Sequence, residues 1–353
     1  MSLSVLKIAH YHILNCRICL TTDDHRVFDT FDRDYNAFKK SDTRPPVDMA
    51  VTVFQKNGGL HLTINDLSWP IDGPHALHCV YHKILDHLHQ HLAQRFFLIH
   101  AGAVAREGQA ILIGGPAGAG KSTLTLALTR LGYGFMSDDL APLDRITGMV
   151  NPFPRALWIA DPNVPPICGH LRSGKSPVSM ADFGDRRICD PQQPKALLWL
   201  TSGTEGGSPS QTLRLTLDPS GETEILEALR KVESVTLTCI PPHTWRVCAS
   251  DIPEVNNKLK HILQAFDARI WQVYREQHFK GDYSRPPQIT PCPPTEMAMH
   301  LIRELKQVPW LEFQTRSAAR WLMELTSLLS RFCCYELQVG NLSDTLDLIS
   351  PFY

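Results

Sequence analysis

The sequence has no excess of charge of either sign and no long apolar run. Its 35 Lys and Arg residues are balanced by 36 Asp and Glu residues, for a net charge of -1. This balance argues against nucleic acid or anionic lipid as a bulk partner. The longest apolar runs, such as residues 196–200, are far too short to cross a bilayer. The first residues also lack the basic start and the unbroken apolar core of a signal peptide. We therefore expect a cytoplasmic protein that has no nucleic-acid or membrane partner.

The ten cysteines lack the spacing of a zinc site. Cys16 and Cys19 form a single Cys-x-x-Cys pair, and no second pair follows at a zinc-binding distance. In a reducing compartment, most cysteines are therefore expected to be small core residues.

What the sequence does contain is one complete phosphate-loop motif. Residues 115–122 read GPAGAGKS and fit G-x-x-x-x-G-K-[ST] at every required position. An apolar segment, 109–115, precedes the motif as a predicted buried strand, and a predicted helix begins at Lys121 and is stopped by Gly132. Glycines let backbone N–H groups curl around phosphate oxygens, and the helix N-terminus adds a favourable partial charge. The expected nucleotide-binding residues are Gly115, Pro116, Ala117, Gly118, Ala119, Gly120, Lys121, Ser122 and Thr123.

The loop chemistry implies ATP and Mg²⁺ as cofactors. Lys121 is expected to reach the β- and γ-phosphates, and Ser122 is expected to bind Mg²⁺. Asp138 and Asp139 follow 17 and 18 residues after Lys121, at the end of a predicted strand over 133–137. A carboxylate there can bind Mg²⁺ or accept a proton from an attacking hydroxyl. Adjacent strand residues point to opposite faces, so the two acids are expected to divide these roles.

Two classes of nucleotide-binding protein are excluded by missing motifs. Transporter-type ATPases need an LSGGQ-like signature, switch GTPases need an NKxD-type guanine reader, and the sequence contains neither. Small-molecule kinases that resemble shikimate kinase do place an Asp at this distance from the loop. They are much shorter, however, and they begin at the phosphate-loop strand.

Residues 98–144 resemble the C-terminal catalytic domain of HPr kinase/phosphorylase, and most of all the bacterial HPr-kinase-related proteins of peptide-modification gene clusters. In that family, a strand His before the loop, the loop Lys-Ser and a downstream Asp pair form the active site. The matching positions are His100, Lys121, Ser122, Asp138 and Asp139, and Lys121 follows His100 by 21 positions, as in the family. Residues 151–159, NPFPRALWI, are similar to a further family segment and add Arg155. Residues 334–349 resemble the family's closing strand and helix.

The resemblance also implies residue roles and a fold. Asp138 becomes the general base, and Asp139 helps to hold Mg²⁺. His100 contacts the phosphates or the base, and Arg155 contacts a phosphate or an acidic residue. The implied fold is α/β, a P-loop kinase domain of the HPr kinase/PEP carboxykinase-like type over residues 96–353 with a C-terminal helical extension. Residues 1–95 are predicted to form a smaller α+β N-terminal domain.

The expected activity is transfer of the γ-phosphate of ATP to a hydroxyl, a Ser of a protein or peptide such as a natural-product precursor. The family segments that are linked to dephosphorylation are not recognisable here, so kinase activity is expected without phosphorylase activity. Two alternatives stay open, a P-loop kinase of a small metabolite and a non-catalytic ATP-binding regulatory protein. Homo-oligomer formation is also left open.

Apolar periodicity and turn residues place the other elements. A hairpin is predicted over 51–64, a helix over 74–94, and a single strand over 96–105. Farther along, strands are predicted at 195–200 and 212–217, a short helix at 224–232, and one long helix at 253–277. The proline-rich segment 285–294 is expected to be a linker or an extended arm. Helices at 297–305 and 317–329, a strand at 334–339 and a helix at 342–349 complete the chain.

Overall fold

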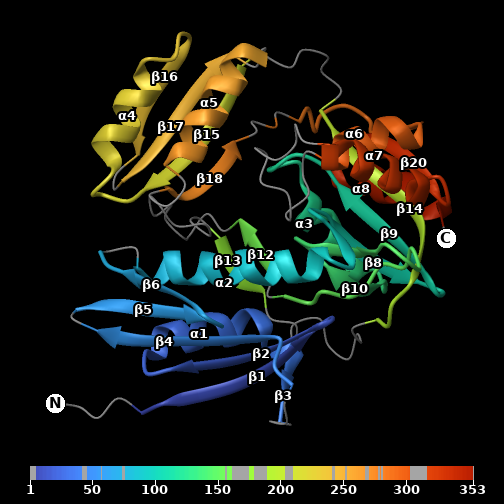
Figure 1. Cartoon of the computed structure of the whole chain (residues 1–353). Helices are drawn as coiled ribbons and strands as arrows, with labels where there is room; N and C mark the ends of the chain where they lie inside the picture. Colours follow the sequence, from blue (N-terminus) through green and yellow to red (C-terminus); the bar gives the residue numbers. More distant parts are fainter. Residues whose placement is uncertain are drawn as a thin grey trace.

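Figure 1 shows the computed structural model of the chain, a mixed α/β protein with several sheets. The structure describes residues 5–41, 46–56, 58–73, 76–155, 157–160, 175–178, 189–202, 210–240, 243–250, 253–266, 270–276, 279, 281–302 and 316–352. Within these ranges, the N-terminal sheet is blue in Figure 1, the central sheet is largely green, and a third sheet is yellow to orange.

The N-terminal sheet has the strand order β3-β1-β2-β4-β5-β6. Its strands are β1 (Lys7–Ile13), β2 (Cys16–Thr22), β3 (Lys39–Lys40), β4 (Met49–Lys56), β5 (Gly59–Ile64) and β6 (Leu67–Ile71). The predicted hairpin over 51–64 is confirmed, because β4 and β5 pair as antiparallel neighbours. Two helices, α1 (His25–Tyr35) and α2 (Ala76–Ala93), pack on this sheet, and a short 3-10 turn, η1 (Asn36–Phe38), follows α1.

Period-two and period-3.6 patterns build the core of this part of the chain. Alternate residues of β1 and β2 are buried, and α2 buries Val80, Ile84, Leu88 and Leu92 along one stripe. The same hydrophobic cluster includes four residues from beyond position 95: Phe96, Leu98, Leu140 and Phe153. The core around the N-terminal sheet is therefore completed by later parts of the chain.

The central sheet has the strand order β10-β8-β9-β14-β20-β19. Its strands are β8 (Gly102–Arg106), β9 (Gln109–Gly114), β10 (Gly134–Ser137), β14 (Gln193–Thr201), β19 (Gln288–Pro291) and β20 (Cys333–Gln338). Strand β14 is parallel to both β9 and β20, whereas β8 is antiparallel to both β9 and β10. Consequently β9 and β10 run in the same direction and end at the same edge of the sheet.

Helices cover both faces of the central sheet. On one face, α6 (Pro294–Ile302) and α7 (Arg316–Leu329) pack on a cluster that contains Leu112, Leu197 and Trp199. On the other face, α3 (Lys121–Arg130) and α8 (Leu342–Ile349) pack on a cluster that contains Ile111, Ile113 and Leu198. A 3-10 turn, η5 (Ser350–Phe352), follows α8. Strand residues thus alternate between two buried faces, as a sheet covered on both sides requires.

The single strand predicted over 96–105 is wrong. The segment divides at His100 and Ala101 into β7 (Phe96–Ile99) and β8, and these strands belong to different sheets. Strand β7 pairs instead with β11 (Ala141–Asp144) in a two-stranded antiparallel ribbon. A tight turn makes the division, because the Ala101 N–H donates to the Ile99 carbonyl at 2.9 Å.

The single long helix predicted over 253–277 is also wrong in its second half. Helix α5 (Pro253–Ala265) ends early, and Ile270–Glu276 forms strand β18, which pairs with β15 (Ser210–Leu217). The third sheet has the order β16-β17-β15-β18, with β16 (Val235–Ile240) and β17 (Thr244–Ser250), and α4 (Glu222–Arg230) and α5 pack on it. Tertiary pairing with β15 decides the conformation of a segment rich in β-branched and aromatic residues.

The proline-rich segment forms an extended arm, in which β19 pairs with β20. The predicted helices near 297–305 and 317–329 correspond to α6 and α7, although residues 303–315 lie outside the described ranges. A separate ribbon pairs β12 (Leu157–Ala160) with β13 (Lys175–Val178). Of the cysteines in the described ranges, four are buried, fewer than expected: Cys16, Cys79, Cys292 and Cys334. In the part of the chain that the structure describes, no helix combines the length and apolar character needed to cross a membrane.

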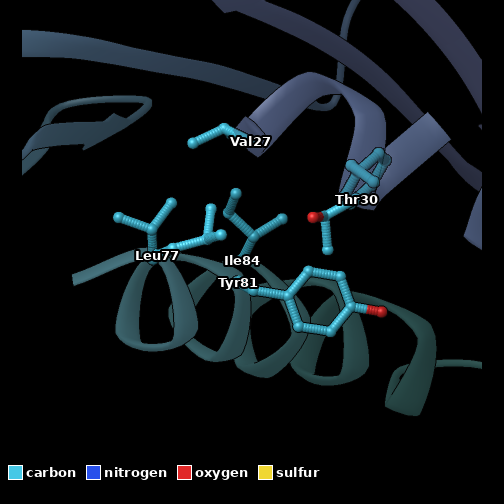
Figure 2. A pocket seen from close by; sticks show the side chains of 7 residues that line it. Val27, Thr30, Leu77, Tyr81 and Ile84 are labelled. Carbon is cyan, nitrogen blue, oxygen red and sulfur yellow. The ribbon is translucent and has the colours of Figure 1, made fainter. Parts of the chain in front are cut away.

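An apolar crevice lies between α1 and α2, lined by residues that include Val27, Leu77, Tyr81 and Ile84 (Figure 2). About 190 Å³ of empty space, part of it open to solvent, lies in the crevice, and none of it admits a water molecule. The Tyr81 ring borders the crevice, and its hydroxyl points away from the other labelled side chains. We therefore interpret the crevice as a packing gap between two helices.

Candidate functional site

The phosphate-loop motif forms the connection between β9 and α3. Three of its glycines have positive φ angles: Gly115 at 143°, Gly118 at 84° and Gly120 at 94°. At Gly115, a Cβ atom would lie 2.9 Å from the Leu200 Cβ and 3.1 Å from the Leu200 carbonyl oxygen. The backbone at Gly115 therefore has a φ angle that L residues rarely adopt, and it passes too close to β14 to leave room for a side chain.

Helix α3 begins directly after this turn. Its N-cap is Gly120, which has no side chain to bond the first N–H groups of the helix. The first helical residue, Lys121, is 7 % exposed. Its ammonium donates to the carbonyl oxygens of Gly115 at 2.7 Å and of Pro116 at 3.1 Å. The loop thus encircles a nearly buried cation at the positive end of a helix, which is a favourable place for an anion.

Asp138 and Asp139, which follow strand β10, lie at the same edge of the central sheet as the phosphate loop. Asp138 and Asp139 follow β10, which is separated from β9 by one strand, so the ends of these two strands lie about 10 Å apart at this edge. Asp138 is 6 % exposed, whereas the Asp139 side chain is 44 % exposed. The pair therefore divides into one buried and one accessible carboxylate.

His100 lies beside Asp139 because of the β7–β11 ribbon. In that ribbon, Ile99 is opposite Ala141, so the residue after β7 meets the residues just before β11. The His100 Nε2 is 3.1 Å from the Asp139 Oδ1. The division of the predicted strand at residue 100 is what brings this imidazole to the acidic pair.

Arg155 contacts the other oxygen of the same carboxylate. Its Nη1 donates to the Asp139 Oδ2 at 3.3 Å, and its side chain is 11 % exposed. The segment that carries Arg155 is fixed by Phe153, whose N–H donates to the Met136 carbonyl of β10 at 2.8 Å. The buried Phe153 ring also packs against Tyr35 and Phe38.

The remaining contacts of Arg155 come from the N-terminal part of the chain. Its Nη2 donates to the Tyr81 hydroxyl at 3.1 Å and lies 3.5 Å from the Asp34 Oδ2. The Tyr81 hydroxyl in turn donates to the Asp34 carboxylate, and the guanidinium lies 5.3 Å from the centre of the Tyr35 ring. Four groups from α1, α2 and the loop after β10 thus surround one guanidinium.

Burial alone would lower the pKa of Arg155. Electrostatic interactions with Tyr35, Tyr81, Asp139 and Asp34 outweigh burial and raise the pKa well above its ordinary value. The guanidinium therefore stays charged, and it is held between two carboxylates from different parts of the chain.

The structure brings together three of the residues singled out in the sequence, His100, Asp139 and Arg155. It places the phosphate loop and Asp138 at the same edge of the central sheet. Sequence reasoning missed Asp34, Tyr35 and Tyr81. A signal was present for Asp34, because this acid shares the buried helical stripe of Val27, Phe31 and Tyr35. An acid within an apolar stripe indicates a buried partner of opposite charge.

A second group of potential ligands is made of other residues. Among the residues that the structure describes, Glu296, His300 and Glu336 have ligand atoms within 4.8 Å of one another. The His300 Nε2 is 3.1 Å from Glu336, and its ring stacks on Trp199 with 5.1 Å between the ring centres. The group does not include the predicted Mg²⁺ ligands, Ser122 and Asp139.

No model of a known protein family matches the chain, and no curated protein does. Among solved structures, the chain is similar to the HPr(Ser) kinase/phosphatase from Coxiella burnetii, with 19% sequence identity and a TM-score of 0.24. The match covers 31% of this chain and 63% of that one, which is less than two thirds of its length. A likeness at this level carries no argument about activity.

Proposed function

We propose that this protein is an ATP-dependent phosphotransferase that moves the γ-phosphate to a hydroxyl acceptor. The observation that carries the proposal is the glycine loop around Lys121, which lies at the same sheet edge as Asp138 and Asp139. Phosphoryl transfer is catalysed mainly by positioning and charge stabilisation. A loop that fits phosphates and a nearby pair of carboxylates are the two elements that this chemistry needs.

The loop geometry supports a nucleoside triphosphate as the ligand. The Lys121 ammonium now bonds two loop carbonyls, and phosphate oxygens would replace these acceptors when the nucleotide binds. The uncapped start of α3 adds backbone N–H donors for the same anion. In our proposal, Lys121 stabilises the charge of the transferred group.

Mg²⁺ fits the proposed site by the chemistry of its donors. The Ser122 hydroxyl and the Asp139 carboxylate are hard oxygen ligands, which this ion prefers. When bound, Mg²⁺ would neutralise charge on the phosphate oxygens. The Asp139 carboxylate is accessible. One of its oxygens lies beside His100 and the other pairs with Arg155, so its orientation is constrained from two sides.

Asp138 is the proposed general base, which accepts the proton of the attacking hydroxyl. The resemblance of residues 98–144 to HPr kinase/phosphorylase supports a Ser of a protein or peptide as the acceptor. It also supports an HPr kinase/PEP carboxykinase-like type for the domain over residues 96–353.

The test uses the full chain with labelled ATP, Mg²⁺, and parallel panels of serine peptides and hydroxylated metabolites. Asp138→Asn is expected to abolish transfer while ATP affinity stays within a few fold, because the substitution removes the base and leaves the loop intact. Transfer that survives Asp138→Asn would show that the base is assigned wrongly. Transfer to metabolites alone would exclude the peptide acceptor, and a wild-type chain that does not bind ATP would refute the proposal.

A further inference from the structure

We infer that Asp34 and Tyr81 are positioning residues of the proposed transfer site, which act on Asp139 through Arg155. The inference rests on the proposed function, and it gives the N-terminal part of the chain a role in that function. Neither residue is expected to touch a substrate. Their effect is to fix the guanidinium that holds one oxygen of the accessible carboxylate.

The first observation is the burial of Asp34 in an apolar setting. It is 1 % exposed and shares the buried face of α1 with Val27, Phe31 and Tyr35. Burial of a carboxylate is unfavourable unless a cation and hydrogen-bond donors compensate for it. Tyr81 and Arg155 supply these groups, and Arg33 is more distant at 3.8 Å. The nearer cation thus comes from the segment after β10 and not from α1 itself.

The second observation is the arrangement of the Arg155 guanidinium. One end, Nη2, is directed to Tyr81 and Asp34, and the other end, Nη1, is directed to Asp139. A planar guanidinium fixed at one end has its other end fixed in direction as well. The buried Nε has no hydrogen-bond partner among the described residues, so the two Nη atoms make the polar contacts that orient the group.

The third observation is that the contact continues to His100. Asp139 is bonded by Arg155 on Oδ2 and lies beside His100 on Oδ1. Movement of the guanidinium would therefore change both the direction of the carboxylate and its distance to the imidazole. In phosphoryl transfer, a displacement of about 1 Å can lower the rate on the order of a hundredfold.

The experiment compares Asp34→Asn with Asp32→Asn, a matched control on the same helix. Asp32 also accepts from a tyrosine, Tyr11 at 2.8 Å, and pairs with a cation, Lys39 at 2.9 Å, but Arg155 is not among its partners. Tyr81→Phe and Tyr11→Phe form a second matched pair, in case a change at the buried Asp34 prevents folding. Thermal unfolding establishes which variants are folded.

In steady-state kinetics, Asp34→Asn and Tyr81→Phe are expected to lower kcat at least about tenfold, with KM for ATP within about twofold. The Asp32 and Tyr11 variants are expected to keep the wild-type kcat. In an Arg155→Met background, Asp34→Asn is expected to cause no further loss, because Arg155 transmits its effect. An equal kcat for Asp34→Asn and Asp32→Asn, or an undiminished loss in the Arg155→Met background, would overturn the inference.

A measurement without turnover separates this inference from the proposed function. Histidine labelled with ¹³C at Cε1 gives a ring signal for His100, which His100→Gln identifies. Asp34→Asn is expected to shift this signal, and Asp32→Asn is expected to leave it in place. If the wild type transfers no phosphate but the signal shifts, the proposed function fails and the positioning contact stands. If the signal stays in place in Asp34→Asn, the positioning inference is wrong.

Discussion

Replacement of Gly115 by alanine tests whether the loop geometry is what binds a nucleotide. Gly115 has a φ of 143°, and an added Cβ would meet the Leu200 Cβ at 2.9 Å and its backbone nitrogen at 3.3 Å. Leu200 is buried within β14, so its atoms have little room to move. Gly132, at the end of α3, is the matched control, because its φ is 102° and its Cβ would meet no atom within 4 Å.

The expected magnitudes follow from this difference. Both substitutions place an L residue at a positive φ, which costs about 1–3 kcal/mol. Gly115→Ala adds an overpacking cost of about 1–3 kcal/mol against Leu200. We therefore expect Gly115→Ala to lower the free energy of unfolding more than Gly132→Ala does, by about 1–3 kcal/mol.

The assay is urea unfolding with and without MgATP. A ligand present at a hundred times its Kd raises the free energy of unfolding by about 2.7 kcal/mol. Wild type and Gly132→Ala are expected to show this increase, and Gly115→Ala is expected to lose most of it because the loop can no longer enclose the phosphates. Equal stabilisation by MgATP in both variants would refute the reasoning.

Three further predictions concern acid stability, an ion pair and thiol reactivity. Hydrogen bonds from Arg26 lower the pKa of the fully buried Asp24 carboxyl to about 2, although burial opposes them. The lowered pKa contributes about 2 kcal/mol to the free energy of unfolding above about pH 5, and this contribution is lost as the pH falls through 4 toward 2. In urea unfolding, the wild type should therefore lose this stability relative to Asp24→Asn on acidification. Hydrogen bonds from Arg145 lower the pKa of Glu324. The substitution Glu324→Gln should therefore lower the free energy of unfolding by about 1 kcal/mol, as calorimetry at pH 7 would measure. Burial raises the pKa of Cys16, Cys79 and Cys334 to about 12, so iodoacetamide at pH 8 should modify the exposed Cys239 and Cys333 before these three, as mass spectrometry would detect.

Local patterns predicted the strand–loop–helix unit around the phosphate loop. The apolar run of β9, the glycines and the start of α3 are contiguous, so their geometry follows from neighbouring residues. The two wrong elements depended on distant partners. Strand β7 leaves the line of β8 because β11 pairs with it, and residues 270–276 become β18 because β15 pairs with them. Neither partner is visible within a window of helical or strand periodicity.

The candidate site was predicted only where its residues lie near the loop in sequence or match a known segment. The positions of Asp138, Asp139 and His100 relative to the loop followed from spacing and resemblance. The contacts of Asp34 and Tyr81 with Arg155 join residues more than 70 positions apart, and no pattern in the sequence pairs them. The acid in the apolar stripe of α1 signals that Asp34 has a partner without identifying which residue it is.

The packing of Phe153 bears on how the protein can be dissected. Phe96, Leu98, Leu140 and Phe153 are buried in a cluster whose other members come from residues 9–92. A fragment that begins at residue 96 would expose these four side chains together, and such a patch promotes aggregation. We expect the two separately produced fragments to become soluble only when they are expressed together, through fragment complementation. The segment that carries the Asp139-binding arginine thus packs against the N-terminal part of the chain.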